Sequence, residues 1–263
     1  MTTISHARPS LTNNDAAVLQ ALFDAESSPS SGVTVDSSLP PWPTTVNISQ
    51  QDLDNLKAQE TQIILKLQTH ETPSQKTVQS ALEELNALLE QHPTYPPAYT
   101  NRAQTLRLLA DLEYNQRHAE AEPESAESNT HEALFTPEAA DLSARIFADL
   151  GKAITLATPA SPADPISSLQ ARLLADAHTH RGYLLLKAAR VKKTRSDGEV
   201  QNVMPQRLRG YSADQLEEMA SRDFFFGGRY GNKVAQQLAV QTNPYAKMCG
   251  AIVKEAMRKE MEG

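Results

Sequence analysis

Apolar residues recur every three or four positions along most of the chain, which is the spacing of amphipathic α-helices. Segments rich in proline separate these stretches, and proline ends a helix because it lacks the backbone N–H. Helices are therefore predicted at residues 51–68, 76–91, 98–112, 137–156, 166–190, 212–224, 233–240 and 244–261. The pattern as a whole predicts an all-α protein.

Small residues stand among the large apolar ones where two predicted helices must touch. Ala103 and Ala153 lie in one predicted pair of helices, and Gly182, Ala220 and Gly227 lie in the next. A helix pair that cannot bury its apolar face alone stacks on another pair, and stacked pairs commonly form a binding surface. The pattern therefore predicts a helical-repeat protein.

The spacing of these residues resembles the tetratricopeptide repeat, a unit of about 34 residues with small residues at its eighth, twentieth and twenty-seventh positions. Gly182, Ala220 and Gly227 take these three positions in the last unit, and Ala103 and Ala153 take the first and third in the middle unit. The resemblance implies a right-handed α-solenoid of about three helix pairs. The repeats are expected at about residues 51–93, 96–157 and 166–230.

Other segments have compositions that do not support packed helices. Residues 1–48 are expected to be mostly disordered, with a short helix near residues 14–24. Residues 113–136, rich in Glu, Ala and Ser, and the basic residues 191–211 are expected to be flexible insertions. The amphipathic stretch 244–261 is expected to form a capping helix. Together these features predict one repeat domain over residues 49–263.

The tryptophan of the chain, Trp42, lies between prolines in the sequence PPWP. One interpretation is a docking peptide for another protein. The favoured interpretation is that Trp42 fastens this segment onto the helices.

Three stretches carry a further resemblance, to the tetratricopeptide repeat protein 36 family. They are residues 14–23 (NDAAVLQALF), 98–104 (AYTNRAQ) and 243–249 (NPYAKMC), which occur in the family's order. The resemblance spans nearly the full length and implies a non-enzymatic protein without a cofactor. It also implies a link to tyrosine metabolism through protection of a partner enzyme. The insertions near 113–136 and 191–211 depart from the compact members of this family.

Charge and composition exclude several classes of function. A net charge of -7 and a pI near 5.5 disfavour general nucleic-acid binding, which needs a basic surface. The sequence has no apolar run of about 20 residues that would span a membrane. The single cysteine, Cys249, fits a reducing compartment, so the cytoplasm or the nucleus is expected.

Candidate catalytic and metal-binding residues were considered at three places. His178 and His180 lie about 200° apart on a helix, which disfavours a shared metal ion; one is expected at the surface and the other in a groove. Cys249 has no identifiable base. The glycine-rich residues 227–232 lack the spacing of a phosphate loop and favour a helix stop with left-handed glycines. No catalytic, metal-binding or cofactor-binding residue is predicted.

The tetratricopeptide resemblance implies that the first helix of each pair lines a concave groove. The residues expected to contact a protein partner in this groove are Asn101, Gln104, Arg107, Thr179 and Tyr183. Asn101 could instead form a hydrogen bond between helices. Chaperone-binding members hold a peptide's terminal carboxylate with cations, but Glu60 and Asp176 stand where two lysines would be. Binding of the chaperone C-terminus is therefore not expected.

These observations predict an adaptor or stabiliser that binds a protein through the concave groove. One alternative is a structural assembly component, for example in cilium or complex assembly, that binds through its outer face. Another is a small hydrolase or transferase on a helical scaffold, which would need a convergent set of acids or a nucleophile. Mutations that abolish partner binding should lie in the groove of an adaptor and on the outer face of an assembly component.

Overall fold

The computed structural model describes residues 33–68, 72–118, 133–243 and 258. Within these ranges the regular structure is α-helical, apart from an isolated bridge between Val35 and Ile166. The all-α class is therefore confirmed. The helices are α2 (Gln50–Gln68), α3 (Gln75–Gln91), α4 (Pro96–Arg117), α6 (Ala140–Ala157), α7 (Ser168–Thr194), α8 (Asp197–Val203), α9 (Gln206–Arg209), α10 (Ala213–Arg229) and α11 (Lys233–Thr242).

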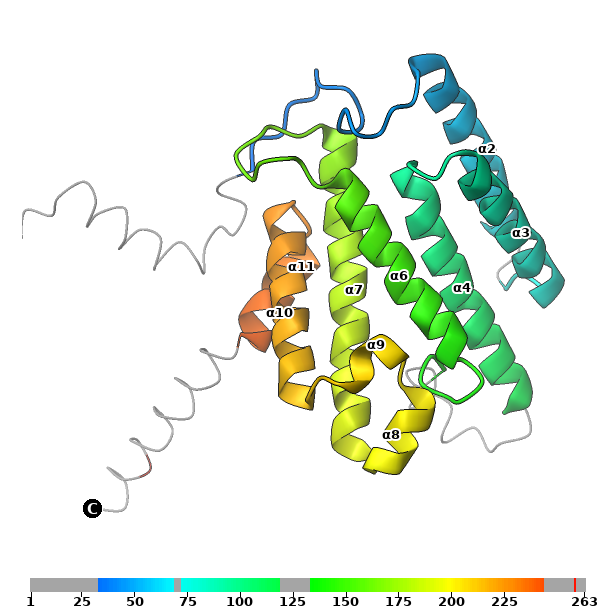
Figure 1. Cartoon of the computed structure of the whole chain (residues 1–263), viewed down its shortest axis with the longest axis vertical. Coiled ribbons are helices and arrows are strands. Elements are labelled where there is room, and N and C mark those ends of the chain that lie inside the picture. The colour runs from blue at the N-terminus through cyan, green and yellow to red at the C-terminus, as the bar shows by residue number, and fades with distance from the viewer. Residues whose placement is uncertain (1–32, 69–71, 119–132, 244–257, 259–263) are drawn as a thin grey trace, which may run out of the picture.

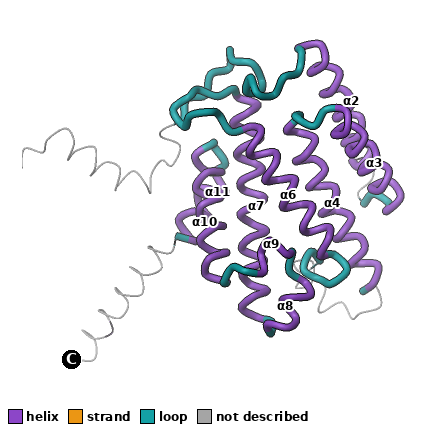
Figure 2. Tube along the Cα trace, viewed as in Figure 1, coloured by secondary structure: helices purple, strands orange, loops and turns teal. Residues whose placement is uncertain are grey.

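The long helices lie side by side in the order of the chain (Figures 1 and 2). Helix α2 packs on α3, α3 on α4, α4 on α6, α6 on α7, α7 on α10, and α10 on α11. A smaller contact joins α4 to α7. Each long helix is therefore stabilised mainly by the helices before and after it.

Small residues lie where the helices approach most closely. Ala103 of α4 and Ala153 of α6 are fully buried in the core. At Gly182 a Cβ atom would stand 3.0 Å from the Phe224 ring and 3.2 Å from the Ala220 carbonyl oxygen. Side chains larger than these would push the helix backbones apart.

Two buried ion pairs repeat the same arrangement in successive helix pairs. Arg102 of α4 donates to Asp149 of α6, with Nε–Oδ2 and Nη2–Oδ1 distances of 2.8 and 2.6 Å. Arg181 of α7 donates to Asp223 of α10 at 2.8 and 2.7 Å. Each arginine directly precedes the small residue at its helix contact, Ala103 or Gly182. The two pairs therefore occupy matching positions.

The second ion pair includes His178. Its Nδ1 atom lies 2.8 Å from Asp223 Oδ1, and its ring stacks on Tyr230 at 6.0 Å between centroids. His178 is only 6% exposed. The expectation that one histidine of the 178–180 pair lies at the surface is therefore wrong, because His178 is a buried partner of Asp223.

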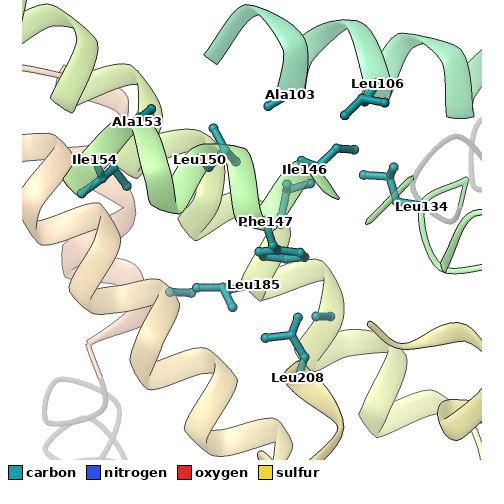
Figure 3. Packing of buried hydrophobic residues seen from close by; sticks show 14 of the residues in the cluster. Ala103, Leu106, Leu134, Ile146, Phe147, Leu150, Ala153, Ile154, Leu185 and Leu208 are labelled. Atoms are coloured by element: carbon teal, nitrogen blue, oxygen red, sulfur yellow. The ribbon is translucent and has the colours of Figure 1, made fainter. Parts of the chain in front are cut away.

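The predicted flexible insertion at 113–136 is too wide at both ends. Helix α4 continues to Arg117, and Leu134 and Phe135 are buried in the core. Figure 3 shows Leu134 pointing toward Leu106 and Ile146. The core reaches back before α6 because these apolar side chains fill the space beside α4. Residues 119–132 lie outside the described residues.

The predicted flexible insertion at 191–211 is wrong. Helix α7 continues to Thr194, and the segment then forms α8 and α9. The α8–α9 segment buries four apolar side chains against the other helices, and this burial orders it. These side chains are those of Val200, Val203, Met204 and Leu208.

The prediction of disorder over residues 1–48 fails for residues 33–48. Asp36 N donates to Ile166 O at 2.8 Å, and Ser167 Oγ donates to Pro41 O at 2.8 Å. Trp42 meets the Tyr95 ring edge-on at 6.4 Å between centroids. The favoured interpretation of Trp42 is therefore confirmed. The helix predicted near 14–24 and, apart from Arg258, the helix predicted at 244–261 lie outside the described residues.

The glycine-rich end of α10 differs in part from the predicted helix stop. Of its glycines, Gly231 has a positive φ, 105°, and follows the end of the helix. Gly227 and Gly228 are helical and buried instead. A Cβ on Gly227 would stand 2.7 Å from Thr179 Oγ1 and 3.0 Å from the Ala235 Cβ, so this glycine permits close packing of α7, α10 and α11.

A search of the described helices for a membrane-crossing segment finds none of sufficient length and apolar character.

Candidate functional site

A groove of about 660 Å³ has walls that come mainly from α2, α4 and α7. Pro41 and Trp42, from the segment before α2, also line it. These three helices are the first members of the predicted pairs. The size falls within the range of about 300–1,000 Å³ typical of ligand pockets.

A carboxylate is fixed in the groove by two hydrogen bonds. Tyr95 Oη donates to Glu60 Oε2 at 2.6 Å, and Asn101 Nδ2 donates to Glu60 Oε1. Burial raises the pKa of Glu60, although both hydrogen bonds oppose the shift. Burial, and then the nearby Glu60 charge, raises the pKa of Tyr95. Glu60 therefore joins α2 to α4 and gives this wall acceptor character.

His180 lines the groove from α7. Burial, together with the charges of Arg107 and Lys187, lowers the pKa of His180 to about 4. Its Nε2 atom is buried without a hydrogen-bond partner among the described residues. A buried polar atom of this kind favours a ligand group that completes the hydrogen bond.

Apolar side chains form the edges of the groove. Leu65 of α2 is 48% exposed and Leu169 of α7 is 49% exposed, and both line the cavity. Leu53, Ile64 and Trp42 add further apolar surface. Exposed leucines gathered around one cavity indicate a surface that another molecule covers.

The structure brings together two of the five residues predicted to contact a partner. Asn101 and Gln104 both line the groove. Arg107 lies beyond this lining, 3.8 Å from Asp111, and acts on the groove through its charge on His180. Tyr183 is exposed, with Lys187 Nζ 4.9 Å from its ring centre.

Thr179 lies on another face of α7. Its Oγ1 donates to Ala175 O at 2.6 Å and lies close to Gly227 of α10. The structure therefore places Thr179 in the contact between α7 and α10. Asn101 makes the alternative hydrogen bond between helices while also lining the groove.

The sequence-based prediction missed Trp42, Leu65 and Leu169 as groove residues. Leu169 lies within the capping box formed by Ser167 and Gln170, which fixes the start of α7. An apolar residue in the first turn of a capped helix was the sequence signal that could have indicated Leu169 as a groove residue. Glu60 and Asp176, considered because they replace cations of the chaperone clamp, both line the groove.

The low pKa of His180 predicts a loss of stability on acidification. The unfolded chain takes up a proton near pH 6.5 and the folded chain only near pH 4, so the stabilisation is complete above 6.5 and declines as the pH falls toward 4. The loss is at most about 3 kcal/mol. Urea unfolding of wild type and His180→Leu at a series of pH values measures it.

The His180→Leu curve should fall less steeply than the wild-type curve over this interval, because other titrating groups are common to both proteins. Parallel curves of unfolding free energy against pH for the two proteins would contradict the lowered pKa of His180.

Comparison with known proteins gives one informative match. The chain is 62% identical over 262 residues to "L-tyrosine degradation gene cluster protein hmgX" of Aspergillus fumigatus, an alignment that covers 100% of the chain and 98% of the relative. No protein-family model matches the chain, and neither does any solved structure.

Proposed function

The chain belongs to the family of hmgX, and on this premise we propose that it is a non-enzymatic adaptor that binds and stabilises an enzyme of L-tyrosine degradation. The observation that carries the proposal is the groove with exposed Leu65 and Leu169 on opposite helices. Burial of these leucines by a partner segment would supply the main driving force for binding.

The proposed architecture is a right-handed tetratricopeptide solenoid of the pairs α2–α3, α4–α6 and α7–α10. Its support is the packing between chain neighbours and the contact between α4 and α7, the first helices of successive pairs. The small residues at Ala103, Ala153, Gly182 and Gly227 provide further support, since each lies buried at a helix contact.

The biological setting rests on two separate indications. The relative is named for a gene cluster of L-tyrosine degradation. The resemblance of residues 14–23, 98–104 and 243–249 to the tetratricopeptide repeat protein 36 family independently implies protection of an enzyme of tyrosine metabolism. Both indications support the same class of partner.

The proposed mechanism follows from the chemistry of the groove. A segment of the partner enzyme lies along α2, α4 and α7, with apolar side chains against Leu65 and Leu169. The Glu60 carboxylate accepts hydrogen bonds from the polar groups of this segment. The His180 Nε2 atom completes one more, as acceptor or donor according to the tautomer of the neutral ring. A preformed groove loses little conformational entropy on binding, so more of the contact energy remains as affinity.

Affinity capture with mass spectrometry tests this proposal. The tagged wild-type protein is expected to retain an enzyme of L-tyrosine breakdown, whereas the Leu65→Asp/Leu169→Asp variant loses it, because two charges would be placed against apolar partner groups. Val240→Asp is the matched control, since Val240 is 45% exposed on α11 and does not line the groove.

All three proteins should have the same circular dichroism spectrum, because the substituted side chains are exposed. Equal retention of the enzyme by the double variant would overturn the groove assignment and favour binding through the outer face. Retention of no such enzyme by the wild type would contradict the proposed function.

A further inference from the structure

A second cavity, of about 420 Å³, lies on the other face of α7 from the groove. Helix α7 contributes His178, Arg181 and Leu185 to this outer cavity, and Asp176 and His180 to the groove. Successive helical residues are rotated by about 100°, so these two sets point in opposite directions. The outer cavity also takes residues from α6, α9 and α10.

The outer cavity is positively charged. Three arginines and one aspartate line it, which leaves a formal charge of +2 when His178 is neutral. The chain as a whole has a net charge of -7. A positive cavity in an acidic protein attracts anionic ligands over a neutral or cationic molecule of the same shape.

The aspartate of the cavity is already fully engaged. Asp223 accepts two hydrogen bonds from Arg181 and lies 2.8 Å from His178 Nδ1. Its burial raises its pKa, but the hydrogen bonds from Arg181 and His178 outweigh this effect, so the pKa is lowered and Asp223 stays ionised. Arg181 and Asp223 therefore form a fixed, charge-compensated floor.

The other two arginines are available to a ligand. Arg207 of α9 and Arg222 of α10 both line the cavity and are exposed. Neither forms an ion pair with a carboxylate of the described residues, although Arg222 lies 5.9 Å from the centre of the Phe226 ring. A guanidinium group binds a carboxylate through two parallel hydrogen bonds.

The remaining walls are apolar. Figure 3 shows Phe147, Leu185 and Leu208 converging from α6, α7 and α9. Met219, Phe226 and Tyr230 of α10 and the residue after it complete these walls. A cavity with apolar walls and a few polar groups at one side matches the usual character of small-molecule sites.

The segment that carries Arg207 is held in place by hydrogen bonds. Lys192 Nζ donates to Arg209 O at 2.7 Å, and Arg209 Nε donates to Met204 O at 2.9 Å. Met204 and Leu208 are buried on either side of Arg207. The backbone at Arg207 is therefore fixed before a ligand arrives, which lowers the entropic cost of binding.

We propose that the outer cavity binds a small carboxylic acid with an apolar, ring-sized body, whose carboxylate is bound by Arg207 and Arg222. The apolar body lies against Phe147, Leu185 and Phe226. The same carboxylate chemistry could come from an acidic side chain of a partner protein, but the apolar residues that line the cavity favour a free acid with an apolar body. This site is independent of the groove and of the proposed adaptor function.

Isothermal titration calorimetry of the full chain with phenylacetate and phenylpropionate tests the site. Saturable binding of at least one acid to the wild type is expected. Arg207→Gln and Arg222→Gln should each weaken it tenfold or more, because each removes a charged hydrogen bond to the carboxylate. Arg145→Gln is the matched control, since Arg145 is an exposed arginine of α6 outside the cavity and should leave affinity unchanged.

Two further ligands identify which part of the acid is recognised. Phenylethanol, which keeps the ring and lacks the carboxylate, should not bind measurably. Inorganic sulfate should bind at least tenfold more weakly than the acid. Sulfate binding as tight as that of the acid, or equal acid affinity in the Arg207→Gln and Arg222→Gln variants, would overturn the proposal.

Absence of acid binding to the wild type would also overturn it. Loss of a captured partner protein from the two variants, without acid binding to the wild type, would assign the arginines to an acidic side chain of that partner instead. Equal unfolding midpoints of all variants would show that the changes act on the site and not on the fold.

Discussion

The Asp149→Ala variant is expected to lose about 3–5 kcal/mol of unfolding free energy, the largest effect predicted for this chain. Asp149 is 4% exposed and is bonded through both carboxylate oxygens to Arg102. These hydrogen bonds raise the pKa of the Arg102 guanidinium, which therefore stays charged. Without Asp149, the Arg102 charge would keep the Asn86 Oδ1 atom at 2.9 Å and the Tyr99 ring, with its centroid 5.6 Å from Cζ, as partners, and neither carries a negative charge.

Urea unfolding followed by circular dichroism measures this loss. The double variant Arg102→Met/Asp149→Leu should recover most of it, because no uncompensated charge is left and both side chains fill similar volumes. A change within about 1 kcal/mol for Asp149→Ala would contradict the view that this pair stabilises the α4–α6 contact.

Gly227→Val is expected to lower the free energy of unfolding by about 3 kcal/mol, at the upper end of the usual cost of overpacking. The Cβ atom of any side chain here would stand 2.7 Å from Thr179 Oγ1, 3.0 Å from the Ala235 Cβ and 3.3 Å from the Ala175 carbonyl oxygen. These atoms belong to α7 and α11, so relief in one direction increases the clash in the other.

The control for this change is Gly198→Ala, in helix α8. A Cβ atom at Gly198 has no other atom within 4 Å. Alanine should therefore stabilise the protein by about 0.4–1 kcal/mol through its lower conformational freedom in the unfolded chain. Thermal unfolding of both variants separates the two cases, and an unchanged midpoint for Gly227→Val would refute the tight packing of α7, α10 and α11.

The helix contacts could be predicted from the sequence because close approach of two backbones requires small residues. Ala103, Ala153 and Gly182 were identified by this requirement alone, and each is buried at a contact. The start of α10 was similarly readable from its capping residue Ser212, whereas α4, α7 and α10 continue beyond their predicted ends.

The α8–α9 segment could not be recognised in the same way because its charged residues concealed its role. Lys192 and Arg195, interpreted as solvated, donate to backbone oxygens of Arg209 and Phe135 at 2.7 and 2.8 Å. Long basic side chains can bond to distant carbonyl groups while their stems pack on apolar surface. Sequence spacing does not reveal which carbonyl group lies within their reach.

The groove was predicted in outline but not in its lining. Asn101 and Gln104 follow from the side of α4 that faces the neighbouring first helices. Trp42 and Leu169 could not be placed in the groove, because their position depends on how the segment before α2 folds back onto the start of α7. The prediction for Thr179 was wrong because adjacent residues of a helix point to different faces. His180 lines the groove, whereas Thr179 lies in the contact between α7 and α10.

Helix α7 is one continuous helix of 27 residues that supplies side chains to both cavities. Deletion of one residue in its first half would rotate every later side chain by about 100° relative to the earlier ones. His180 and Arg181 would then lose their positions together. Natural variation in length should therefore be absent from α7 and concentrated in connections such as residues 158–167, where an added residue changes no helical phase.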